Sequence, residues 1–87
     1  ARERLSTGGS AGTVVDVKLL FKTALDARAA AAIAIHNHPS GNLQPSQADI
    51  ELTRRLRQAG TLLDLPLLDH LIVSERGYFS FADEGIL

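Results

Sequence analysis

The sequence predicts a small α/β domain in which helices flank a mixed sheet, arranged in two or three layers. Apolar residues recur with the helical period of 3.6 in two segments, and shorter apolar runs typical of strands alternate with them. A short turn separates the last two runs, which predicts a hairpin. In chain order, the expected elements occupy residues 16–29 (helix), 30–35 (strand), 45–60 (helix), 67–73 (strand) and 78–81 (strand).

The first helix is expected to begin at Asp16, whose carboxylate can accept hydrogen bonds from amides of the first turn. Residues 1–12 are rich in Gly and Ser, so beyond a strand end near Leu5 they are expected to form a loop. One face of the helix carries the apolar residues Val17, Leu20, Phe21, Ala24 and Leu25.

The run at 30–35 is short and continuously apolar, which is typical of a buried parallel strand. The second helix begins at Pro45-Ser46 and is expected to stop at Gly60. Its inner side is expected to carry Ile50, Leu52, Leu56 and Ala59, and its solvated side Arg54, Arg55 and Arg57.

Composition excludes several classes of protein. The 87 residues include nine basic and ten acidic side chains, so a net charge of −1 gives no general attraction to nucleic acid. The absence of Cys excludes disulfides, cysteine-ligated zinc and a thiolate nucleophile. No apolar run approaches the ~20 residues of a membrane span and no signal peptide opens the chain, so a cytoplasmic location without membrane contact is expected. Because the chain begins at Ala1 rather than Met, we expect residues 1–87 to form a single domain within a longer protein.

Two histidines and an aspartate lie close together in the sequence, directly after the first predicted strand. Side chains two residues apart on an extended segment point the same way, so His36 and His38 can reach one ion. Asp49 can approach from the start of the second helix. Two nitrogens and one carboxylate oxygen leave a tetrahedral zinc ion with one position open for water, which is typical of a catalytic site.

Each part of this pattern also has a structural interpretation. Ser46 and Asp49 form an S-x-x-D sequence, close to the capping box that begins many helices. His36 and His38 could be loop histidines with hydrogen-bonded rings. The combination favours a metal site, because all the candidate ligands can converge at the carboxyl end of one strand.

The spacing His-x-His-x7-Ser-x-x-Asp resembles the signature of the JAB1/MPN (JAMM) metalloprotease domain. The segments His36-Asn37-His38-Pro39-Ser40-Gly41 and Pro45-Ser46-Gln47-Ala48-Asp49, with Leu67-Leu68-Asp69-His70-Leu71-Ile72-Val73, are similar to its bacterial RadC branch, long labelled DNA repair proteins. The resemblance extends from about Glu3 to Gly85.

This resemblance implies a JAB1/MPN-like (cytidine-deaminase-like) fold whose N-terminal strand is truncated, forming the C-terminal part of a RadC-type chain. It implies a zinc-dependent hydrolase that cleaves an amide or isopeptide bond in a peptide substrate. His36, His38 and Asp49 would ligate zinc, and Ser46 would help bind the oxyanion. The family's general base is a glutamate on an upstream strand, and Glu3 is the residue that matches it best.

Other assignments are weighed against this one. Glu51 is discounted as the base, because it follows Asp49 by two helical positions and points about 200° away from it. Asp69 and His70 must face opposite sides of their strand, so at most one can orient a ligand imidazole. The absence of Cys excludes a zinc deaminase.

A binding module that keeps the fold and acts in DNA repair is the alternative function. Nucleic-acid binding would then be expected, although the charge balance does not support it. Tyr78, Phe79 and Phe81 are expected to be core residues rather than a platform for stacking bases. The sequence does not indicate an oligomeric state.

Overall fold

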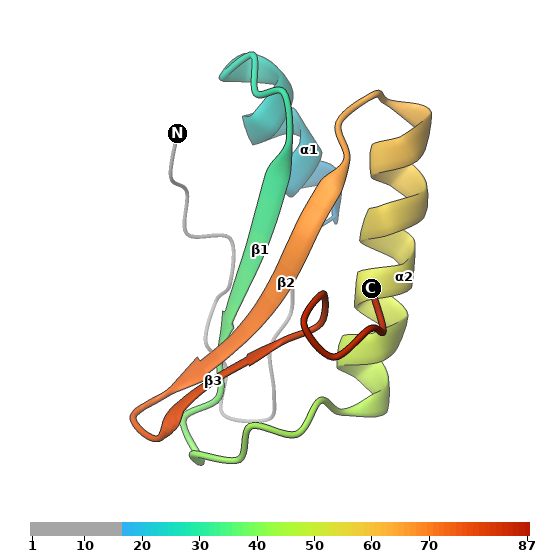
Figure 1. Ribbon diagram of the computed structural model, residues 1–87. Helices are drawn as coiled ribbons and strands as arrows, with labels where there is room; N and C mark the ends of the chain where they lie inside the picture. Colours follow the sequence, from blue (N-terminus) through green and yellow to red (C-terminus); the bar gives the residue numbers. More distant parts are fainter. Residues whose placement is uncertain (1–16) are drawn as a thin grey trace.

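The computed structural model describes residues 17–87, and the expectations for Glu3, Leu5 and Asp16 lie outside them. The order of elements is the predicted one, helix, strand, helix, strand, strand (Figure 1). The elements are α1 (Val17–Asp26), β1 (Ala32–Asn37), α2 (Gln47–Leu62), β2 (Leu67–Ser74) and β3 (Gly77–Ser80).

Within residues 17–87 the sheet has the order β1-β2-β3 and is mixed, as predicted. β1 and β2 are parallel, with His36 opposite Ile72. β2 and β3 form the predicted antiparallel hairpin, with Ile72 opposite Phe79. β2 is therefore the central strand of this part of the sheet, and α2 is the connection between the two parallel strands.

Both helices cover the same face of the sheet. Phe21 of α1 and Leu56 of α2 meet Leu65 and Leu67, at the start of β2, in one buried cluster. The partly buried residues packed around this cluster are Val17, Leu20, Ala24, Ala32, Ala34, Leu52, Ala59 and Leu87. Phe81 is also fully buried, as expected of a core residue, whereas Tyr78 is exposed. No helix of the described chain is long and apolar enough to cross a membrane.

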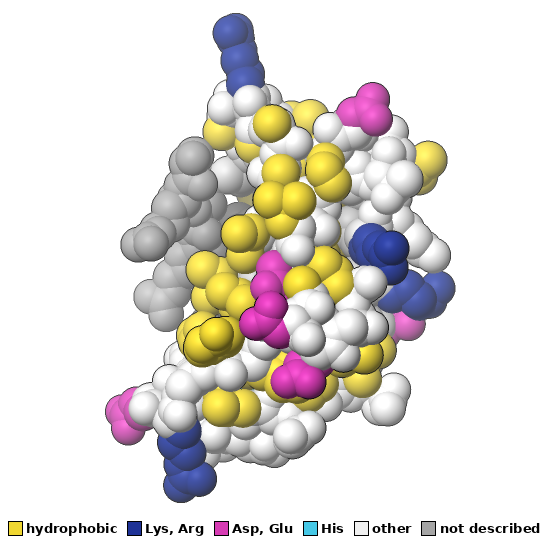
Figure 2. All heavy atoms as spheres, in the orientation of Figure 1, with side chains coloured by type: hydrophobic (Ala, Val, Ile, Leu, Met, Phe, Trp, Pro, Cys, Tyr) yellow, Lys and Arg dark blue, Asp and Glu magenta, His cyan; other side chains and the backbone are white. Residues whose placement is uncertain are grey.

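The opposite face of the sheet is largely uncovered by the described residues. The prediction of a buried first strand is wrong in this respect, because Ile33 and Ile35 are 54% and 62% exposed. Their side chains alternate with Ala34 and His36, which point to the helices. Figure 2 shows hydrophobic side chains gathered over the sheet, with no histidine on that view of the molecule.

The predicted inner faces of the helices are partly wrong. Leu25 is exposed because α1 ends one residue later, at Asp26, instead of continuing to residue 29. Ile50 is exposed because the buried stripe of α2 runs through other positions. That stripe consists of Asp49, Thr53, Leu56 and Gly60.

Gly60 was predicted to end α2. It lies inside the helix instead, two residues before Leu62. A Cβ atom at this position would lie 2.5 Å from the carbonyl oxygen of Leu65. The amide of Leu65 in turn donates a hydrogen bond to the Gly60 carbonyl, at 2.8 Å. Gly60 is therefore required for the close return of the chain from α2 to β2.

Asp69 holds the C-terminal segment against β2. Its carboxylate accepts hydrogen bonds from the Ser80 hydroxyl and from the amides of His70 and Ala82. Burial raises the pKa of Asp69, but these hydrogen bonds outweigh burial and hold the pKa below its usual value. The ionised carboxylate is thus part of the fold.

We expect Asp69→Asn to lower the free energy of unfolding at neutral pH by about 1–3 kcal/mol, because an amide replaces a charged acceptor. A lowered folded-state pKa stabilises the protein above the unfolded value of about 4, and that contribution is lost as the pH falls through the folded-state pKa. The difference between wild type and variant, measured by urea unfolding, should therefore shrink on acidification. Asp83→Asn is the control, since the Asp83 side chain is exposed. A difference unchanged at about pH 2 would contradict this account.

Candidate metal centre

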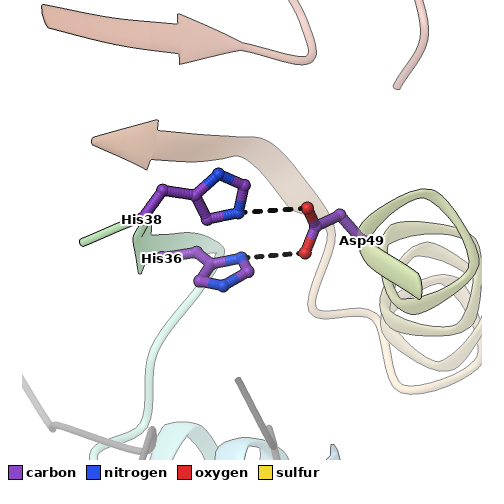
Figure 3. Close-up of side chains that lie close together, drawn as sticks. All are labelled: His36, His38 and Asp49. Carbon is purple, nitrogen blue, oxygen red and sulfur yellow. Dashed lines mark ion pairs between the residues drawn. The ribbon is translucent and has the colours of Figure 1, made fainter. Parts of the chain in front are cut away.

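Three side chains from two elements converge at the carboxyl end of β1. His36 is the penultimate residue of β1, and His38 directly follows the end of the strand. Asp49 lies in the first turn of α2. Figure 3 shows both imidazoles pointing to the Asp49 carboxylate. His36 Nδ1 lies 3.1 Å from Asp49 Oδ1, and His38 Nε2 lies 3.2 Å from Asp49 Oδ2. The structure therefore brings together the residues that the sequence predicted as ligands.

The centre is largely closed to solvent. His36 and Asp49 are only 5% and 4% exposed, and one potential ligand atom from each of the three residues lies within 4.8 Å of the others. In the described part of the chain, this is the one group of three or more such side chains that could hold a metal ion. Nitrogen and carboxylate oxygen donors suit a divalent transition metal or zinc.

Ser46 and Asp49 form the capping box that the sequence suggested. Ser46 Oγ accepts a hydrogen bond from the Asp49 amide at 3.0 Å, and the Ser46 amide donates to Asp49 Oδ2 at 2.8 Å. The second bond holds the same carboxylate oxygen that faces His38. Capping and metal binding are therefore compatible, because the cap orients the candidate ligand.

The loop after β1 fixes the orientation of the His38 ring. His38 Nδ1 lies 2.6 Å from the carbonyl oxygen of Asn42. A carbonyl oxygen only accepts, so Nδ1 must carry a proton and donate it. In the neutral ring, Nε2 then presents a lone pair to the Asp49 carboxylate. Two acceptors at this distance require a proton or a metal cation between them, and a backbone carbonyl on the remote nitrogen is typical of a metal-bound histidine.

Burial and hydrogen bonding favour the protonation states of His36 and Asp49 that can bind a cation. Burial lowers the pKa of His36, which favours the neutral ring. Burial also raises the pKa of Asp49, but hydrogen bonds from Ser46, together with the electrostatic effect of the nearby imidazoles, outweigh burial and keep the pKa below its usual value. The Asp49 carboxylate and the neutral His36 ring are donors complementary to a dication.

A second layer of polar contacts lies behind the centre. The Thr53 hydroxyl donates to the Asp49 carbonyl at 2.8 Å and lies 2.5 Å from His70 Nδ1. Since the hydroxyl has one hydrogen, His70 Nδ1 is the donor of the second bond. The His70 ring stacks between His36, at 5.9 Å between centroids, and Phe81, at 4.6 Å. Burial lowers the pKa of His70 to about 4, so this ring is neutral near pH 7.

Asp69 and His70 face opposite sides of β2, as predicted, and it is His70 that contacts a candidate ligand. Thr53 was missed by the sequence analysis. Its signal was its position four residues after Asp49, on the same face of α2. Glu51 pairs with Arg54 on the exposed side of the helix, which agrees with its rejection as the base.

A mixed α/β domain with two histidines and a carboxylate at the end of a parallel strand is a candidate metal-binding domain. The chain belongs to the family of RadC-like JAB domains, whose family model matches residues 1–86.

Several relatives align with nearly the whole chain. The chain is 54% identical to a UPF0758 protein of Flavobacterium johnsoniae, 52% to one of Porphyromonas gingivalis and 48% to one of Thermotoga maritima. These alignments cover 99%, 98% and 95% of the chain, but only 38%, 38% and 37% of the relatives. The chain thus spans little more than a third of their length.

We expect Asp49→Asn to weaken metal binding by more than about 100-fold, because even a residue that only orients a ligand typically contributes 10–100-fold. The measurement is isothermal titration with Zn²⁺ as the probe, with circular dichroism to check the helix that Asp49 also caps. Asp83→Asn makes the same change on an exposed side chain and should bind as wild type does. Unchanged affinity in a folded Asp49→Asn protein would exclude Asp49 as a ligand.

Proposed function

We propose that this chain carries the catalytic centre of a zinc-dependent hydrolase that cleaves amide or isopeptide bonds. The observation that carries the proposal is the convergence of His36, His38 and Asp49, with a lone pair of His38 Nε2 directed at the carboxylate. Membership of the RadC-like JAB family supports it. Three protein ligands leave one tetrahedral position for water or substrate.

His36, His38 and Asp49 would hold the ion in this proposal. Zinc bound there would supply a water molecule whose pKa is lowered towards neutrality, and would polarise the carbonyl group of the substrate. The chain's own residues orient the centre: the Ser46 amide holds Asp49, the Asn42 carbonyl holds His38, and the His70 ring packs on His36.

We assign Ser46 a second role, at the substrate. Its hydroxyl oxygen accepts the bond from the Asp49 amide, and the cap does not require its hydroxyl hydrogen. That hydrogen can be donated to the oxyanion that develops on the carbonyl under attack. Ser46→Ala should then lower turnover more than it lowers zinc affinity.

The alternative of a DNA-repair binding module has no specific support in residues 17–87. Of the three arginines on the outer side of α2, Arg54 pairs with Glu51, and Arg57 donates to the Leu87 carbonyl at 2.8 Å. The outer helix face is therefore not a row of free cations. We keep the hydrolase as the single proposed function.

Zinc-loaded protein should cleave members of a peptide and isopeptide library, and His38→Ala should abolish cleavage together with zinc binding. The reason is that His38 supplies one of only three ligands. Cleavage is followed by mass spectrometry, with and without a chelator. Restoration by added Zn²⁺ is the control for the chelator. Cleavage that survives both the chelator and the His38 substitution would contradict a metal-dependent reaction.

The general base is a separate part of the proposal, since Glu3 lies outside the described residues. If Glu3 shuttles the proton, Glu3→Gln should retain zinc and lose turnover by about 100-fold or more. Glu51→Gln is the matched control and should keep both, because Glu51 is engaged with Arg54. Unchanged turnover in Glu3→Gln would show that another group, such as one from the remainder of a longer chain, acts as the base.

A further inference from the structure

A hollow of about 440 Å³ adjoins the candidate metal centre and shares one of its residues. It is lined by residues 37–41, which end β1 and begin the following loop, and by residues 74–76, which end β2 and form the turn to β3. His38, whose Nε2 faces the centre, is part of this lining. Both segments lie at the same end of the sheet (Figure 1). Whatever occupies the hollow therefore lies beside the ligand His38.

The two walls of the hollow are held together by the fold. The His38 amide donates to the Val73 carbonyl at 3.0 Å, which joins the loop to the end of β2. The Arg76 amide donates to Ser74 Oγ at 3.0 Å, which fixes the backbone of the turn. Hydrogen bonds made by backbone amides therefore hold both walls of the hollow in place.

Arg76 is the cation of the hollow, and its side chain lies over the loop. The guanidinium lies next to Gly41, since a Cβ atom there would be 3.4 Å from Arg76 Nε and 3.9 Å from Cζ, in ordinary van der Waals contact. Gly41 also has φ +84°, which strains any other residue. Gly41 therefore permits the loop conformation that lies next to the Arg76 head group.

The Arg76 guanidinium has no carboxylate partner among residues 17–87. Two other cations of this part of the chain are in ion pairs, Lys22 with Asp26 and Arg54 with Glu51. Glu75 lines the same hollow but forms no ion pair with its neighbour Arg76. A guanidinium presents a planar fork of donors that matches a carboxylate in bidentate geometry.

We infer that this hollow is a substrate subsite in which Arg76 binds a carboxylate next to the bond under attack. The inference deepens the proposed function and rests on it. The carboxylate belongs either to the C-terminus of a peptide or to an acidic side chain near the scissile bond. Glu75, as a like charge to the ligand, opposes binding and so restricts the hollow to groups that reach the guanidinium.

The test is a titration of the zinc-loaded chain, followed by NMR at the Arg76 Nε–H. N-acetylglycine should shift this signal, and N-acetylglycinamide at the same concentration should not, because it lacks the charge. Arg76→Gln should weaken N-acetylglycine binding by about tenfold or more, the usual effect of a charge-assisted hydrogen bond. Arg55→Gln, the control on an exposed arginine of α2, should leave binding unchanged.

A second probe distinguishes the two sources of the carboxylate. The α-amide of N-acetylglutamate carries its single carboxylate on the side chain, whereas N-acetylglycine carries it at the chain end. The tighter binder identifies the source. Glu75→Gln should strengthen binding of that probe, since it removes the like charge.

Two results would overturn the subsite. One is binding of both probes that is unchanged in Arg76→Gln, since the carboxylate would then bind the zinc ion alone. The other is the absence of any Arg76 shift with either probe. A chain that cleaves no peptide would instead contradict the proposed hydrolase, and the titration would still decide separately whether Arg76 binds carboxylates.

Discussion

The parallel pairing of β1 with β2 is the constraint on which the other features depend. Parallel neighbours need a crossover, and here the crossover is α2 together with its flanking loops. A helix that returns the chain to the start of the next parallel strand must begin near the end of the previous one. The start of α2, with Asp49, is thereby placed at the end of β1, with His36 and His38. The candidate centre follows from the topology of the sheet.

Hydrogen bonds then refine what the topology places. Ser46 orients the carboxylate, Asn42 orients one imidazole, and Thr53 joins α2 to His70 behind the other. Each of these contacts involves a group that already has a local structural role, in a cap, a turn or a helix. The candidate centre is therefore oriented by hydrogen bonds from groups that also stabilise the neighbouring helix and loop.

The order of elements and the converging trio could be predicted because they depend on short-range patterns: period, turn residues, and the spacing of His36, His38 and Asp49. The faces of the helices could not be fully predicted. The exposure of Leu25 depends on where α1 ends, and the exposure of Ile50 depends on how α2 is rotated about its axis on the sheet. Gly60 was wrongly predicted to end α2, because glycine is required there by the close approach of the Leu65 backbone. The hydrophobic pattern of the sequence does not indicate that contact. The pairing of Thr53 with His70 joins positions 17 residues apart, which no periodicity indicates.

The bond from His38 to the Asn42 carbonyl would couple metal binding at the candidate centre to the conformation of the loop. If loop geometry affects how well Nε2 donates its lone pair, then occupation of Nε2 must stabilise that loop geometry by the same free energy. A bound ion and the loop would thus be reciprocal effectors of one another. The wall of the hollow would be most ordered in the metal-loaded protein, and a molecule that orders the loop would raise the affinity of the centre for the ion.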